Sequence, residues 1–352
     1  MTLHDPMGHK LIDIPEQIKT KSFVVIDLDY LCFKVASVLE ERYINVFSED
    51  TLIGKYKNRT EFKKSDQFSE EYTIEDCQSL KSDYKTTMVF LLRKLTEDIK
   101  KATDTQEVVL AAGGTENFRD SIPSPQKYKG HRDSVIRPLA LKECKDYATN
   151  NYITVEGEGM EADDVISMFQ FRSYYDKEYK IVVAAVDKDA LQTHGYLYNP
   201  ETSKGMAKSE VTLIEGLGEI SLKEVSKKRK AVFHGRKTLY FQLLHGDMTD
   251  DYDPSALHKK LIGSTVKAPV LTDLKAYNIL KDCKTDKECL KAIHDVYLEW
   301  YKDIKGWEDW QGNWVEGDYL DLMQCYWDYC FMRRFPGDKV NVRELLTKME
   351  IL

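Results

Sequence analysis

The sequence lacks the features that mark membrane and secreted proteins. Its 352 residues contain no run of about 18 apolar residues that could cross a membrane. The first ten residues, MTLHDPMGHK, have no apolar core of the kind found in a secretory signal. We therefore expect a cytoplasmic protein that makes no contact with a membrane.

Metal-binding cysteine pairs and a nucleotide-binding loop are also missing. The seven cysteines are odd in number and include no C-x-x-C pair, so structural zinc is not predicted. Scattered cysteines in an intracellular protein are by default free thiols. The glycine pair Gly113-Gly114 follows an apolar run, but no G-K-[ST] motif follows it, which argues against a P-loop.

An excess of positive charge is the third absence. The net charge is −8, which argues against a protein that simply coats nucleic acid. Hydrophobic residues make up 42% and charged residues 31%, as in globular proteins with a real core. The charge is nevertheless uneven: residues 119–145 and 221–237 each carry seven basic side chains, against three and one acidic ones. Such patches suit a polyanionic ligand, although ordinary solvated faces would look the same.

Carboxylates follow several of the apolar runs. We predict buried strands over Phe23–Leu31, residues 106–112, residues 152–155 and residues 179–186. Because the carboxyl ends of parallel strands meet at one edge of a sheet, acids that follow them should gather there. A further set follows a helix predicted to begin at Leu239. The acids concerned are Asp27, Asp29, Glu161, Asp163, Asp164, Asp187, Asp189, Asp247 and Asp250. Taken singly, such sets also suit a helix N-terminus or a surface turn.

Together these carboxylates exceed what one cation needs. Two Mg²⁺ or Mn²⁺ ions, roughly 4 Å apart, would use them and could hydrolyse a phosphodiester bond. Lys129 and Arg132 would neutralise the charge that builds on the phosphate. Tyr128 could stack on a terminal base. Our predicted DNA contacts are five residues: Arg119, Tyr128, Lys129, Arg132 and Lys188.

The remaining segments are predicted by pattern. The expected elements are a helix over Phe33–Tyr43, a polar insertion or loop over 44–75, a helix over Thr73–Lys101, a basic helix over 137–149, a helix that starts within Glu156–Val165 and runs to about Tyr175, a hairpin around 198–204, and helices over 255–352. The aromatic-rich segment Tyr297–Phe335 fits a hydrophobic core better than a base-stacking surface.

Five motifs in this order resemble the 5′-nuclease superfamily, which includes flap endonucleases and the 5′-exonucleases of short-tailed bacteriophages. They are Asp27 on the first strand, Y-K-x-x-R at Tyr128–Arg132, E-A-D-D-V at Glu161–Val165, D-K-D at Asp187–Asp189, and G-D-x-x-D at Gly246–Asp250. The resemblance covers roughly residues 22–253, with a weaker match over Leu320–Arg334.

The resemblance implies a PIN-like α/β fold, with a central, mostly parallel sheet flanked by helices. It also implies a helical arch around 119–150 within a nuclease domain over 1–240, and a helical DNA-binding region over 241–352. The first metal ion would be held by Asp27, Glu161, Asp163 and Asp164, and the second by Asp187, Asp189, Asp247 and Asp250.

The activity it implies is that of a metal-dependent 5′→3′ exodeoxyribonuclease. Its substrates would be duplex 5′ ends, flaps or RNA–DNA hybrids. We expect a monomer, in the host cytoplasm if the chain is phage-encoded.

Two departures from the family pattern keep alternatives open. Gly113-Gly114 stands where relatives carry an Asp, so that the first metal is held more weakly, or Glu116 or Asp120 reaches in, or water fills the gap. Of these we expect water or Glu116. The glycine-rich turn that grips duplex phosphate in relatives fits residues 251–255 and 261–265 poorly. The alternatives are a non-catalytic protein that binds branched DNA, a PIN-type ribonuclease, and a partner-binding protein with a calcium-stabilised acidic site.

Overall fold

The structure is a computed structural model that describes residues 3–68, 71–201, 210–225, 228–265 and 270–352. The chain divides into two compact units. The first comprises Met1–Asp27, Ile99–Val135 and Ile153–Leu352, and the second comprises Leu28–Asp98 and Ile136–Tyr152. The division at residue 240 that the sequence suggests, and the arch around 119–150, stay predictions.

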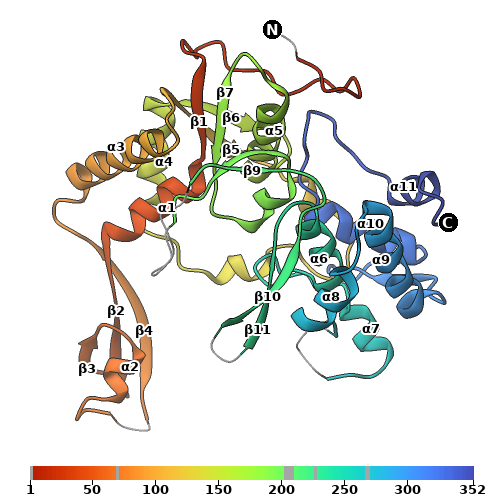
Figure 1. The fold of residues 1–352 in the computed structure, drawn as a ribbon. Coiled ribbons are helices and arrows are strands. Elements are labelled where there is room, and N and C mark those ends of the chain that lie inside the picture. Colours follow the sequence, from red (N-terminus) through yellow and green to blue (C-terminus); the bar gives the residue numbers. More distant parts are fainter. Residues whose placement is uncertain (1–2, 69–70, 202–209, 226–227, 266–269) are drawn as a thin grey trace. The chain divides into compact units, whose positions relative to one another are not determined.

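The first unit is built on a six-stranded sheet in the order β6-β5-β1-β7-β8-β9 (Figure 1). Every neighbouring pair is parallel except β8–β9, which is antiparallel. The strands are β1 (Ser22–Asp27), β5 (Glu107–Gly113), β6 (Ile153–Gly157), β7 (Lys180–Ala184), β8 (Gly195–Tyr198) and β9 (Thr212–Ile214). The predicted α/β class with a mostly parallel sheet is confirmed.

The apolar runs form the interior strands because both faces of the sheet are covered. Phe23 and Val25 in β1 and Val183 in β7 are completely buried. Helix α5 (Ala162–Tyr175) contacts β1, β5, β6, β7 and β8, and it ends where the pattern predicted. Gly195 allows β8 to approach this helix, since a Cβ there would lie 1.8 Å from the carbonyl oxygen of Gln170.

The C-terminal part of the first unit is mainly helical, as predicted. Its helices are α6 (Lys237–His245), α7 (Ala256–Leu261), α8 (Asp273–Leu280), α9 (Asp286–Tyr301), α10 (Tyr319–Cys330) and α11 (Val342–Lys348). Two antiparallel strand pairs accompany them. Strand β10 (Ile220–Val225) pairs with β11 (Lys228–Phe233), and β12 (Gly306–Glu308) pairs with β13 (Trp314–Glu316). Trp307, Tyr326 and Trp327 are buried in one core cluster, so most of the aromatic-rich segment is core.

The second unit corrects three sequence predictions. It contains α1 (Leu28–Val38), β2 (Glu40–Ser48), β3 (Thr51–Tyr56), α2 (Arg59–Lys63), β4 (Thr73–Leu80), the first part of α3 (Tyr84–Ala102) and α4 (Leu141–Asn151). Residues 40–43 begin β2 and do not belong to the helix expected over Phe33–Tyr43, which ends at Val38. Residues 44–75 are not a loop but part of an antiparallel sheet in the order β3-β2-β4. Residues 73–80 are a strand, not the start of a long helix. The strands were missed because this sheet has only a small core around Phe62, which leaves little hydrophobic pattern.

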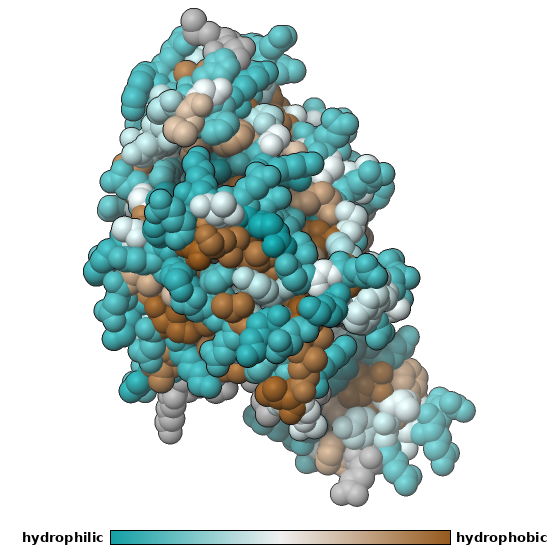
Figure 2. Space-filling view, turned by 90° about the vertical axis from the view of Figure 1, so that its right-hand side faces the viewer, coloured by the Kyte–Doolittle hydropathy of each residue, from teal (hydrophilic) through white to brown (hydrophobic). Residues whose placement is uncertain are grey.

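The structure also bears on the predicted hairpin, on the cysteines and on membrane-spanning helices. The hairpin predicted around 198–204 falls largely outside the described residues, although β8 and β9 pair on either side of the gap. None of the seven cysteines forms a disulfide bond. Among the described residues, no helix is both long and apolar enough to span a membrane. On the face shown in Figure 2, hydrophobic side chains lie in small groups among hydrophilic ones.

Candidate metal centre

Carboxylates from four chain segments converge at the carboxyl edge of the parallel strands. Asp27 ends β1, and β7 leads to Asp187 and the 3₁₀-helix η3 (Lys188–Gln192). Helix α6 ends at His245 and is followed at once by a turn that carries two more acids. Carboxylate oxygens of Asp189, Asp247 and Asp250 lie within 4.8 Å of one another, and all three side chains are buried.

The carboxylates of this cluster repel one another. The pKa of Asp163 is raised well above its usual value, first by burial and then by the charges of Asp27 and Asp187. Burial, followed by the charge of Asp187, likewise raises the pKa of Asp189. Burial also raises the pKa of Asp250, although Lys129 opposes the shift. A cation at this edge would remove the repulsion.

Two lysines lie among the carboxylates. The ammonium nitrogen of Lys129 is 2.6 Å from Glu161 and 3.6 Å from Asp250, and Lys188 pairs with Asp247. Burial alone would lower the pKa of each lysine, but the surrounding carboxylates raise it.

Seven carboxylates thus outnumber the cationic groups near them, which are the two lysines and the guanidinium groups of Arg119 and Arg132. The seven carboxylates are Asp27, Glu161, Asp163, Asp187, Asp189, Asp247 and Asp250. Hard divalent cations such as Mg²⁺ prefer oxygen ligands of this kind. The donor set therefore fits the predicted ions.

Asp164 and Arg119 form a fully buried pair beside the cluster, in which Arg119 also lies 3.6 Å from Glu161. The guanidinium of Arg119 donates to both carboxylate oxygens of Asp164, at 2.6 and 3.1 Å, and neither side chain is exposed. Arg119 also donates to the carbonyl oxygens of Tyr329 and Phe331, and the backbone N–H of Arg333 donates to Asp164. Both oxygens of Asp164 thus accept from Arg119, and neither side chain reaches the surface.

Tyr128 is also interior, whereas Arg132 is accessible. The Tyr128 ring stacks on Tyr329 with centroids 4.9 Å apart, and its hydroxyl donates to Glu161 at 2.9 Å. Because Tyr128 is only 4% exposed, its ring has almost no surface on which a base could stack. The Arg132 side chain is 46% exposed and lies 3.4 Å from Asp250, so it can meet a phosphate.

The structure explains the missing Asp at the end of β5. A Cβ at Gly114 would lie 2.3 Å from the carbonyl oxygen of Gly157, so no side chain fits there. Of the proposed replacements, Asp120 feels the charge of Glu161: burial and then this charge raise the pKa of Asp120. The carboxylate of Glu116 makes no hydrogen bond or ion pair with any described residue. The electrostatic interaction with Glu161 therefore favours Asp120, whereas the sequence favoured water or Glu116.

Sequence reasoning missed the residues that hold the acids in place. The side-chain amide of Gln242 donates to Asp189 at 2.5 Å from the interior of α6. Gln192 binds the backbone of Cys330 and Met332, which ties η3 to the chain after α10. Neither glutamine belongs to a motif, so only the fold could reveal them.

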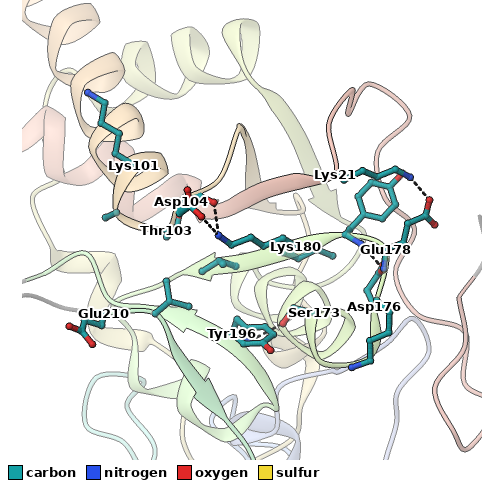
Figure 3. A pocket seen from close by; sticks show the side chains of 16 residues that line it. Lys21, Lys101, Thr103, Asp104, Ser173, Asp176, Glu178, Lys180, Tyr196 and Glu210 are labelled. Carbon is teal, nitrogen blue, oxygen red and sulfur yellow. Dashed lines mark hydrogen bonds and ion pairs between the residues drawn. The ribbon is translucent and has the colours of Figure 1, made fainter.

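A hollow lies at the other edge of the sheet. It measures about 1000 Å³ and opens at the amino ends of β1 and β7 (Figure 3). Lys180 in this hollow binds Asp104 at 2.7 Å, and Lys21 pairs with Glu178. Because the carboxylate cluster is at the carboxyl edge, we assign this hollow no part in the site.

The comparisons with known proteins give structural neighbours only. No family model matches the chain, and no curated protein matches its sequence. The chain is similar in structure to the flap endonuclease of bacteriophage T5 in a pseudo-enzyme-product complex with DNA and metal ions, with a TM-score of 0.41, 10% identity, and 94% of this chain and 98% of that chain covered.

A T5 protein co-crystallised with metal ions (TM-score 0.40, 12% identity, 94% and 97% covered) and a mutant T5 5′-exonuclease (TM-score 0.38, 10% identity, 94% and 99% covered) are similar to the same degree. Likeness at this level carries no argument about function or residue roles.

Proposed function

We propose that this protein is a metal-dependent nuclease that hydrolyses phosphodiester bonds at the 5′ ends of DNA in the 5′→3′ direction. The observation that carries the proposal is the convergence of seven carboxylates from four segments on one sheet edge. Packing alone offers no reason to gather buried charges of one sign, because their repulsion destabilises the fold. The order of the five sequence motifs supports the same reading.

The carboxylates divide by position into two groups of ligands. Asp27, Glu161 and Asp163 would hold one divalent cation, and the other would be held by Asp187, Asp189, Asp247 and Asp250. We do not include Asp164 among the ligands of the first cation, because both of its carboxylate oxygens accept hydrogen bonds from Arg119. When bound, Mg²⁺ or Mn²⁺ would supply an activated water and stabilise the leaving oxygen.

The basic side chains at the site would act on the phosphate. Lys129 is held by Glu161 and Asp250 next to the carboxylates, where it would neutralise negative charge that develops on the scissile group. The half-exposed Arg132 would hold the neighbouring phosphate. Lys188, which pairs with Asp247, would balance charge within the cluster rather than bind DNA.

The proposal extends to the range of substrates, the biological setting, the oligomeric state and the location of the protein. Cleavage of flaps and removal of RNA primers would use the same centre, in replication and recombination of a phage genome. We propose that the protein acts as a monomer in the cytoplasm.

A non-catalytic DNA-binding protein is the second candidate. The specific observation in its favour is Gly114, which stands where relatives of the family carry an acid and where no side chain fits. A PIN-type ribonuclease would share the fold but act on RNA.

Digestion of a linear duplex labelled at its 5′ ends separates these candidates. The reactions contain Mg²⁺ or EDTA, and compare the wild type with Asp189→Asn and with Asp303→Asn, a control at an exposed aspartate. We expect short labelled products that require Mg²⁺ and Asp189 but not Asp303. Bound but uncut DNA would identify a binding protein, and cleavage of single-stranded RNA alone would identify a ribonuclease.

A further inference from the structure

The β10–β11 ribbon carries an unusual pair of charges. In the antiparallel register Lys223 lies directly opposite Lys230, so the two side chains share one face. Like charges in this position destabilise a strand pair. Among the residues that the structure describes, neither ammonium group has an ion pair. An arrangement that costs stability in the free protein suggests an external anion.

The two faces of the ribbon differ in character. On the inner face, Ile220 is buried opposite Phe233, whose ring lies 5.0 Å from that of Phe241. The outer face carries Ser221 opposite Val232 next to the two lysines, and all four side chains are exposed. The outer face is therefore an accessible basic surface.

The ribbon is anchored to the helix that positions the metal centre. The Phe241 ring on α6 packs against the ribbon on one side and stacks on His245 on the other. The backbone N–H of Ala231 donates to Asp273 at 2.8 Å, and Asp273 pairs with His245 at 3.3 Å. Asp247 follows His245 after one residue. The outer face is thus held in a defined position relative to the carboxylates.

We propose that the outer face of the β10–β11 ribbon binds the phosphate backbone of duplex DNA next to the cleavage site. This inference rests on the proposed function and names the part of the substrate that the ribbon takes. Duplex DNA carries one negative charge per 1.7 Å of its axis and attracts clustered lysines without regard to sequence. The ribbon lies on the side to which the carboxyl end of β1 points (Figure 1).

The composition of the outer face favours a duplex over a single strand. Proteins that bind single strands stack the bases on aromatic side chains. The described outer-face residues are Ser221, Lys223, Lys230, Val225 and Val232, and none of them is aromatic. The lysines would meet phosphates, which the two strands of a duplex present outward. The glycine-rich turn that grips duplex phosphate in relatives fits residues 251–255 and 261–265 poorly. The ribbon would make such a contact instead.

The test compares binding of a duplex with a 5′ overhang and of a single strand, measured by fluorescence anisotropy in EDTA at several salt concentrations. The variant is Lys223→Gln/Lys230→Gln. The matched control is Lys302→Gln/Lys348→Gln, two exposed lysines of which one follows α9 and the other ends α11. We expect the ribbon variant to bind the duplex about tenfold more weakly, and its salt slope to fall by about 2, since each phosphate contact contributes about 0.9. Binding of the single strand should not change.

Three results would overturn the inference: unchanged duplex affinity, an equal loss in the Lys302/Lys348 control, or an equal loss for the single strand. Lys223→Arg/Lys230→Arg keeps both charges and should bind like the wild type, so a loss there would indicate packing rather than charge. The melting temperature of the Gln variant should stay equal or rise, because the repulsion is relieved. Failure of the wild type to cut DNA in Mg²⁺ would instead defeat the proposed function.

Discussion

Lys129 has a backbone φ of +52°, in the left-handed region that non-glycine residues adopt at a cost. Its backbone N–H donates to the carbonyl oxygen of Asp250 at 2.9 Å, which fixes the turn. This conformation directs the ammonium group to Glu161. Strain of this kind is typical of residues whose position serves function.

We expect Lys129→Ala to lower the rate more than the affinity. The lysine would act where charge develops in the transition state, so kcat should fall about 100-fold while KM changes little. Single-turnover cleavage of a 5′-labelled duplex measures the rate, and anisotropy measures binding. Lys129→Arg, which keeps the charge, serves as control. A variant that lost affinity alone would assign Lys129 to DNA binding.

Asp120 is our candidate for the acid that is missing at Gly114. Because Asp120 feels the charge of Glu161, Asp120→Asn should weaken Mg²⁺ binding several-fold. Glu116→Gln should leave it unchanged, since Glu116 has no such neighbour. Calorimetric titration with Mg²⁺ compares the two. Weaker binding in the Glu116 variant alone would reverse the assignment.

At the scale of elements, the start of α5 serves two purposes. Glu161 and Asp163 belong to the carboxylate cluster, whereas Asp164 caps the helix and binds Arg119 in the interior. The partner carbonyls of Arg119 belong to Tyr329 and Phe331, at the end of α10 and just beyond it. One ion pair therefore joins α5, η1 (Phe118–Ser121) and the C-terminal part of the first unit.

Asp164→Ala should destabilise the protein by about 3–5 kcal/mol, because it leaves the charge of Arg119 buried without a partner. Urea denaturation measures the free energy of unfolding. Asp164→Asn retains a hydrogen-bond acceptor and should cost less. If Asp164→Ala unfolded at the same urea concentration as the wild type but bound Mg²⁺ more weakly, Asp164 would be a metal ligand after all.

At the scale of the whole molecule, the carboxylate cluster links stability to pH and to metal ions. Where the folded-state pKa of an acid is raised, the folded state binds more protons than the unfolded one, so stability falls as the pH rises above the usual carboxylate value of about 3.9. The raised pKa values of Asp163, Asp189 and Asp250 therefore destabilise the metal-free protein at neutral pH.

We expect Mg²⁺ to raise the melting temperature more at pH 8 than at pH 5.5. In EDTA, Asp189→Asn should be more stable than the wild type at pH 8, by roughly 1 kcal/mol or more, with a smaller difference at pH 5.5. Comparing the two proteins at each pH removes the contribution of the histidines. Equal stability of both at pH 8 would show that the cluster does not strain the fold.

Much of the fold and of the site was visible in the sequence. The apolar runs at β1, β5, β6 and β7 predicted a buried parallel sheet because a strand covered on both faces must be apolar throughout. The acids that follow these runs predicted the carboxyl edge as the site, since the topology of parallel strands brings those ends together. The small sheet of the second unit was missed because its strands are largely solvated.

The sequence by itself determined which residue types reach the sheet edge. These are carboxylates, whose oxygen atoms are ligands that a hard cation prefers. Only the tertiary structure decided how adjacent acids divide their roles. Asp163 and Asp164 are neighbours of the same chemistry, yet one lies near the carboxylates of Asp27, Asp187 and Glu161 and the other meets a buried guanidinium. Helix geometry turns successive side chains by about 100°, and the partner each one meets comes from residues far away in the chain.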